Sequence, residues 1–118
     1  MSENHAATDQ ATVQISRGGS EIRIGVSGSV NVDSSPRVRS ALLSLIRQRA
    51  VLTIIIDLSQ VSYLDTSGIA TLLEAVNIAR ENSVRLRLFG IRDQPRSLAE
   101  LVELDSIFRA LGAEVIFA

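Results

Sequence analysis

The feature that most constrains the fold is an apolar run that leads through a short polar motif into a helical pattern. Residues 51–58 read Val-Leu-Thr-Ile-Ile-Ile-Asp-Leu, a composition typical of a fully buried strand. The motif Asp65-Thr66-Ser67-Gly68 follows, and the apolar residues after it recur at the spacing of an amphipathic helix. The sequence therefore predicts a strand, a short connection and a helix, which is the building unit of an α/β fold.

This order places Thr66 and Ser67 at the N-terminus of the predicted helix. Backbone N–H groups at that end have no intrahelical partner, and the helix dipole is positive there. Either hydroxyl can therefore cap the helix. Either can also carry a phosphate group, which the same N–H groups would help to hold. The residues by themselves leave both roles open.

Composition excludes most kinds of catalytic chemistry. The chain has no cysteine and no lysine, and its one histidine, His5, lies in a polar leader. A disulfide framework, a thiol nucleophile, a zinc–thiolate site, a P-loop lysine and a Schiff base are therefore excluded. Ser67-Gly68 partly matches the nucleophile-elbow motif G-x-S-x-G, but Asp65 stands where that motif requires glycine. We expect a binding or modification site, not an enzyme, with no cofactor and no metal.

Charge and hydropathy point to a cytoplasmic protein. The formal net charge is −1, the arginines are spread from Arg17 to Arg109, and there are only three Phe and one Tyr. A nucleic-acid surface usually needs a basic face with stacking aromatic side chains, so direct nucleic-acid binding is not expected. No apolar run is long enough to insert into a bilayer, and the first residues lack the apolar core of a secretory signal.

The length of 118 residues suits one domain with one core. Residues 1–11 are small and polar and are predicted to form a disordered tail, so the domain is expected to span 12–118. Gly18-Gly19 supplies a hairpin turn between two early strands. Ser35 is expected to cap the first helix, and Asp105 the last one.

Periodicity completes the architecture. An alternating strand is expected near residues 84–88 and a short closing strand at 115–117. Between them, Leu98, Leu101 and Val102 form the apolar face of a further helix. An antiparallel pair followed by strand–helix repeats predicts an α/β domain, with a mixed sheet of about four to five strands and about four helices packed on it.

Three stretches of the chain form a recognisable pattern: Gly28-Ser29-Val30-Asn31, the run Ile-Ile-Ile-Asp-Leu-Ser at 54–59, and Val-Ser-Tyr-Leu-Asp-Thr-Ser-Gly at 61–68. This pattern resembles a STAS domain, and more narrowly a bacterial anti-sigma factor antagonist. The later stretch from Phe89-Gly90-Ile91 onward continues the pattern. The resemblance extends over roughly 13–117, and it implies the STAS fold.

The resemblance also implies a phosphorylation switch. In such antagonists the unphosphorylated protein binds an anti-sigma factor that is also a serine kinase, and this frees a sigma factor. The kinase then phosphorylates the antagonist, which lets go, and a PP2C-type phosphatase resets it. Carried over to this chain, Ser67 is the phosphoacceptor and Thr66 is the second choice. Asp65 would position the acceptor hydroxyl, and Gly68 would let the partner backbone and the ATP phosphate approach closely.

The resemblance assigns a partner-binding surface to residues of two segments. Relatives commonly carry an acidic residue where this chain has Asn31, and Asp33 lies two residues on. The partner-binding residues are expected to be Asn31, Asp33, Asp65, Thr66, Ser67, Gly68, Ile69 and Thr71.

An alternative from another functional class shares the fold. It is a STAS accessory subunit of a transport system, such as the small component of a lipid-transport ABC transporter, which docks to an ATPase without regulated phosphorylation.

Two residues near the motif are expected to have structural roles. Asp57 is expected to bond the backbone of Ser59 or Gln60, and Tyr63 to be a core ring with its hydroxyl at the surface.

Overall fold

The computed structural model describes residues 10–118. In it, five strands form one mixed sheet in the spatial order β1-β2-β3-β4-β5. The strands are β1 (Thr12–Gly18), β2 (Glu21–Val30), β3 (Thr53–Leu64), β4 (Arg85–Ile91) and β5 (Glu114–Phe117). The helices are α2 (Ser35–Gln48), α3 (Thr66–Glu81), α4 (Asp93–Leu101) and α5 (Leu104–Ala110). β1 and β2 pair antiparallel and the other neighbours pair parallel, so the predicted α/β architecture is confirmed.

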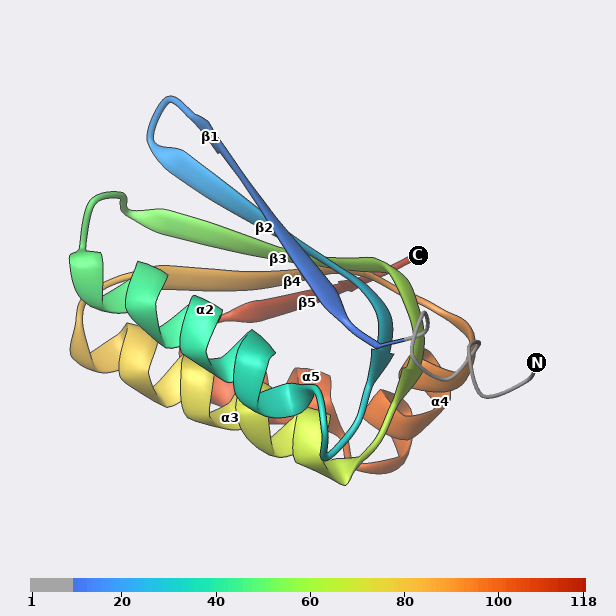
Figure 1. The fold of residues 1–118 in the computed structure, drawn as a ribbon. Helices are drawn as coiled ribbons and strands as arrows, with labels where there is room; N and C mark the ends of the chain where they lie inside the picture. Colours follow the sequence, from blue (N-terminus) through green and yellow to red (C-terminus); the bar gives the residue numbers. More distant parts are fainter. Residues whose placement is uncertain (1–9) are drawn as a thin grey trace.

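The helices lie on one face of the sheet and leave the other face open (Figure 1). The core fills the space between sheet and helices, because alternate residues of the three central strands point toward the helices. From the helix side, Leu42 and Val76 close this core and are fully buried. The fully buried residues of these strands include Ile22, Ile24, Ile54, Ile56, Leu86 and Leu88.

The central strand β3 is longer than the apolar run predicted, because a bulge interrupts its pattern after Leu58. Along β2, Gly25 pairs with Asp57 but Ser27 pairs with Gln60, so β3 carries one extra residue between these pairs. Asp57 Oδ1 accepts hydrogen bonds from Ser59 N at 2.9 Å and from Ser59 Oγ at 2.7 Å. The expected bonding of Asp57 to Ser59 is confirmed, but it supports a bulge within the strand and not a turn at its end.

Four local predictions are corrected by the structure. Helix α2 has Ser34 and not Ser35 as its N-cap, and α5 has Glu103 and not Asp105 as its N-cap. Leu101 was expected in the apolar face of α4, but it is 78% exposed because it is the last residue of a short helix. Tyr63 is also half-exposed and is not a core ring.

The start of the chain joins the fold earlier than predicted. Ala11 is completely buried, its carbonyl accepts a hydrogen bond from Arg37 Nη1 at 3.0 Å, and Gln10 forms a bridge to Ser29. The other residues of the predicted tail, His5 among them, lie outside the described residues. Within residues 10–118, no helix combines the length and the apolar character that crossing a membrane requires.

Helix α3 packs closely on the sheet because it carries glycine at its third position. A Cβ atom added to Gly68 would lie 2.3 Å from Leu64 Cδ1 and 3.1 Å from Val30 Cγ1. Both neighbours are buried, so neither has free space to move into. We predict that Gly68→Ala lowers the free energy of unfolding by about 1–3 kcal/mol, measured by urea titration.

Gly25→Ala is the matched control, because a Cβ there meets only Gln14 O, at 3.8 Å. It should change the free energy of unfolding by less than about 0.5 kcal/mol. Equal losses in the two variants would show that close packing at Gly68 is not what the glycine provides.

Candidate functional site

The junction between β3 and α3 is built around Asp65, the residue that separates the strand from the helix. Its backbone is extended, and its N–H donates to Val30 O of β2 at 3.2 Å. Its carboxylate accepts hydrogen bonds from the backbone N–H groups of Ser67 at 2.9 Å and Gly68 at 3.2 Å. Asp65 is therefore the N-cap of α3. This corrects the expectation that Thr66 or Ser67 caps the helix, because both hydroxyl residues already lie in its first turn.

The two hydroxyl residues differ in their surroundings. Ser67 is partly buried, and its Oγ donates to the same Asp65 oxygen that caps the helix, at 2.5 Å. Thr66 is exposed. The expected contact between Asp65 and the Ser67 hydroxyl is thus present, and it fixes the direction of that hydroxyl.

Gln94 fixes the end of β3 immediately before the motif. Its Oε1 accepts a hydrogen bond from Leu64 N at 2.8 Å, and its Nε2 donates to Leu64 O at 2.8 Å. The side-chain amide of α4 therefore pairs with Leu64 in the way a neighbouring strand would. Sequence reasoning missed this residue, because nothing in the sequence links a glutamine at the start of α4 to the strand end.

The loop between β2 and α2 lies beside the motif. A hydrogen bond from Asp65 N to Val30 O joins the motif to the end of β2, where this loop begins. Asn31 Oδ1 accepts hydrogen bonds from the backbone N–H groups of Asp33 at 2.9 Å and Ser34 at 3.2 Å. This side chain therefore shapes the loop. Because the loop turns outward between these bonds, Val32 is 67% exposed and Asp33 is exposed as well.

The expected partner-binding residues separate into an accessible and a buried group. Asp33 and Thr66 are exposed, and Asn31, Asp65 and Ser67 are partly exposed. The buried ones are Gly68, Ile69 and Thr71.

The burial of this second group corrects two expectations. Gly68 faces Leu64 and Val30 inside the domain, so the absence of a side chain serves internal packing and not the approach of a partner. Thr71 Oγ1 donates to Ser67 O at 3.0 Å within α3. The exposure of Val32 was not predicted, although a large apolar residue between asparagine and aspartate in a turn is a signal of exposure.

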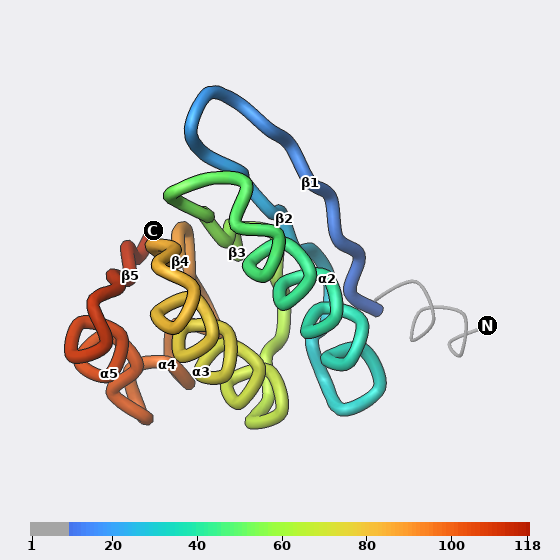
Figure 2. Tube along the Cα trace, turned by 90° about the vertical axis from the view of Figure 1, so that its left-hand side faces the viewer, coloured from blue at the N-terminus to red at the C-terminus, as the bar shows by residue number. Residues whose placement is uncertain are grey.

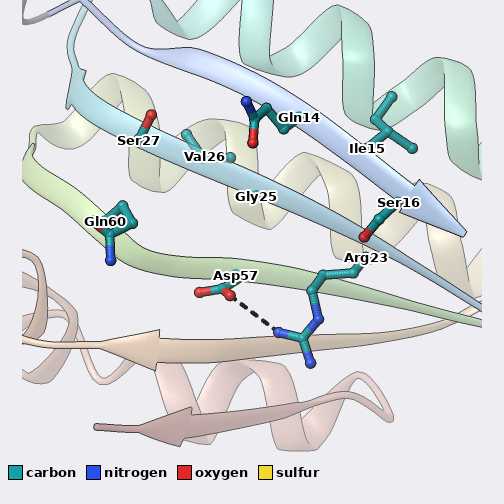
Figure 3. Close-up of a pocket in the computed structure, with 9 residues that line it drawn as sticks. All are labelled: Gln14, Ile15, Ser16, Arg23, Gly25, Val26, Ser27, Asp57 and Gln60. Atoms are coloured by element: carbon teal, nitrogen blue, oxygen red, sulfur yellow. Dashed lines mark hydrogen bonds and ion pairs between the residues drawn. The ribbon is translucent and has the colours of Figure 1, made fainter.

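A second polar cluster lies on the open face of the sheet, away from α3. Arg23 Nη1 and Asp57 Oδ2 are 3.1 Å apart at the edge of an open hollow of about 700 Å³ (Figure 3). Burial opposes the charge of Asp57, but hydrogen bonds from Ser59 and Arg23 outweigh it, so the pKa of this carboxyl lies below its ordinary value. Among residues 10–118, no group of three or more histidine, cysteine or acidic side chains is placed to hold a metal ion.

The five strands and four helices of residues 10–118, with the motif at the head of α3, match a known family. A model of the STAS domain family covers residues 13–117. The chain belongs to the STAS family. Within this family, the anti-sigma-B factor antagonist of Listeria monocytogenes is 30% identical over 93 residues, which are 79% of this chain and 81% of the relative.

Two further similarities bear on the fold and on the alternatives. The solved structure of the anti-sigma factor antagonist SpoIIAA in its unphosphorylated form has a TM-score of 0.73 at 19% identity, and covers 91% of this chain and 88% of that one. This likeness confirms the STAS fold. The intermembrane phospholipid transport system binding protein MlaB of Escherichia coli is 41% identical over 49 residues, which are 42% of this STAS chain and half of the relative.

The capping role of Asp65 gives a prediction for the STAS domain that separates hydrogen bonding from charge. We expect Asp65→Ala to lower the free energy of unfolding by about 1 kcal/mol, because the N–H groups of Ser67 and Gly68 lose their acceptor. Asp65→Asn keeps an acceptor oxygen and should lower the free energy of unfolding by only about 0.3 kcal/mol. Urea titrations of both variants measure the difference, and a full loss in Asp65→Asn would show that the negative charge dominates.

The lowered pKa of Asp57 predicts how stability depends on pH. A carboxyl whose pKa is lower in the folded state stabilises the fold above its unfolded pKa, and this contribution disappears as pH falls through the folded value. The stability advantage of the natural chain over Asp57→Asn should therefore be largest near neutral pH and shrink below about pH 4. Urea titrations at a series of pH values test this, with Asp33→Asn as an exposed carboxylate control. An advantage that stays constant with pH would contradict it.

Proposed function

We propose that this STAS protein is an anti-sigma factor antagonist whose binding is switched by phosphorylation of Ser67. When unphosphorylated, it binds an anti-sigma factor that is also a serine kinase, and thereby frees a sigma factor. The kinase turns the interaction off, and a PP2C-type phosphatase restores it. The protein acts in the cytoplasm as a binding protein and catalyses no reaction of its own. The relative from Listeria, which carries the name of an anti-sigma-B factor antagonist, supports this role.

The observation that carries the proposal is the hydrogen bond from Ser67 Oγ to Asp65 Oδ1. A phosphoacceptor hydroxyl must be oriented and must give up its proton as the phosphoryl group arrives. In the resting protein, Asp65 accepts a hydrogen bond from the Ser67 hydroxyl and so orients its proton. Thr66 is more exposed, and its side chain is not part of the Asp65 hydrogen-bond set. Orientation therefore favours Ser67, and accessibility favours Thr66.

The accessible residues around the motif describe the docking surface. Val32 supplies an apolar contact, and Asp33 and Thr66 supply polar ones beside it. An exposed valine with a polar rim is suited to a partner that buries an apolar side chain at the centre of its own surface. Ser67 lies at the edge of this surface, so a group added to its hydroxyl enters the contact region directly.

A phosphate on Ser67 acts through charge at this surface. It adds about −1.5 to −2 charges beside the carboxylate of Asp65. The N–H groups of Ser67 and Gly68 are already bonded to that carboxylate, so they can bind the phosphate only if Asp65 moves away. The phosphate is therefore exposed to the partner, where like-charge repulsion and the cost of desolvating it weaken the complex.

One observation favours a second candidate function. The similarity to the phospholipid transport protein MlaB reaches 41% identity over 49 residues, although these are fewer than half of the chain. Under this alternative, the same surface at the head of α3 docks to the ATPase of a transporter and no residue is phosphorylated. The two candidates predict different partners, which makes them separable by experiment.

Intact-mass analysis of the protein purified from its own host tests the proposal. We expect a fraction of the natural chain to carry one added phosphate, and this fraction to disappear in Ser67→Ala but to remain in Thr66→Ala. Incubation with a PP2C-type phosphatase should remove the added mass. Co-purification of the Ser67→Ala variant should recover a kinase-like anti-sigma factor.

The control variant is Ser40→Ala, which removes an exposed hydroxyl from α2, outside the motif. It should leave both the added mass and the recovered partner unchanged. Loss of the phosphate only in Thr66→Ala would move the phosphoacceptor by one residue. An unmodified mass under all growth conditions, together with recovery of a transporter ATPase, would replace the proposal with the transport alternative.

A further inference from the structure

The edge strand β1 presents an uncovered backbone. Within the described residues, β1 pairs only with β2, in an uninterrupted register from Thr12↔Ser27 to Gly18↔Glu21. Proteins usually protect such an edge with proline, a bulge or several charged side chains. Thr12–Gly18 contains no proline and no bulge, and its one charged residue is Arg17 near the turn. The outer N–H and C=O groups of β1 are therefore available to another strand.

The opposite edge of the sheet is protected. Strand β5 has four residues, and Arg96 of α4 covers its end. Arg96 Nη1 donates to Ala118 O at 3.1 Å, and its guanidinium lies 4.8 Å from the centre of the Phe117 ring. Figure 2 shows β1 and β5 at opposite sides of the sheet. The contrast indicates that the lack of protection is specific to the β1 edge.

An exposed apolar side chain lies in the middle of this edge. Ile15 pairs with Ile24, whose side chain is buried under the helices, so Ile15 points to the same side of the sheet. It is nevertheless 47% exposed, because the helical layer ends before β1. Its neighbour on that side, Val13, packs partly against the core. Ile15 thus extends the apolar layer beyond the part of the sheet that α2 covers.

We propose that β1 pairs antiparallel with β1 of a second copy of this chain, with Ile15 on the twofold axis. This register overlaps all seven residues of the strand, since Ile15 is its central residue. It places Val13 opposite Arg17 and Gln14 opposite Ser16, so no like charges face each other. The two Ile15 side chains contact across the axis, and the two sheets become one continuous sheet.

The interface is small, so the dimer is weak and its formation depends on protein concentration. The interface contains no residue from 65–68. The proposed dimer can therefore be tested independently of the proposed phosphorylation switch. A single introduced cysteine is a clean probe, because the natural chain has none. In this register, Ile15→Cys brings two thiols directly opposite each other, within the range that a disulfide can bridge.

The test compares Ile15→Cys with Leu52→Cys under mild oxidation. Leu52 is the control because it is 72% exposed but lies in the loop before β3, away from the β1 edge. Disulfide-linked dimer should form at least about tenfold faster in Ile15→Cys than in Leu52→Cys. Equal rates in the two variants would overturn the proposal, since they would reflect random collision of exposed thiols.

Sedimentation equilibrium of the cysteine-free chain gives an independent readout. The weight-average mass should rise with concentration above the monomer mass of 12.7 kDa in the natural chain and in Leu52→Lys. It should stay at the monomer mass in Ile15→Lys, with circular dichroism confirming that this variant is folded. A natural chain that remains monomeric at all concentrations, or a dimer that Ile15→Lys leaves intact, would overturn the proposal.

Discussion

The structure depends on how the chain changes from strand to helix at Asp65. One carboxylate oxygen accepts hydrogen bonds from Ser67 N, Ser67 Oγ and Gly68 N, and thereby satisfies donors that the start of α3 would otherwise leave free. On the strand side, Gln94 and Val30 hold the backbone of Leu64 and Asp65. Since α3 packs against β3 and β4, the position of this junction fixes how the helical layer sits on the sheet.

Because one carboxylate both caps α3 and binds the Ser67 hydroxyl, the proposed phosphorylation would reach the helix cap as well as the surface. Esterifying Ser67 Oγ removes one of the three donors to Asp65 but leaves the two backbone donors in place. The cap therefore survives in large part, and the change is felt mainly as charge at the surface. A switch of this type needs no refolding, which is consistent with a site supported on both sides by regular structure.

The sequence predicts this fold well where the periodicity is strong and poorly where tertiary contacts decide. The apolar run at 51–58 located the buried part of β3, and the motif located the start of α3 to within one residue. The burial of Ile69 and Thr71 depends on the rotation of α3 against the sheet, which no local pattern encodes. The role of Gln94 has the same origin, because its partner Leu64 lies thirty residues away in the chain.

The hairpin that opens the fold explains why the sheet is wider than its helical layer. Parallel strands are joined through helices that cover the sheet, as α2 joins β2 to β3, whereas β1 reaches β2 through a tight turn and brings no helix with it. The strand at this edge therefore has an uncovered inner side as well as an unpaired backbone, and Ile15 is exposed for that reason. The proposed docking residues of the other site come from the loop after β2 and the head of α3. The topology thus assigns the two surfaces to different segments, so that one can be occupied without blocking the other.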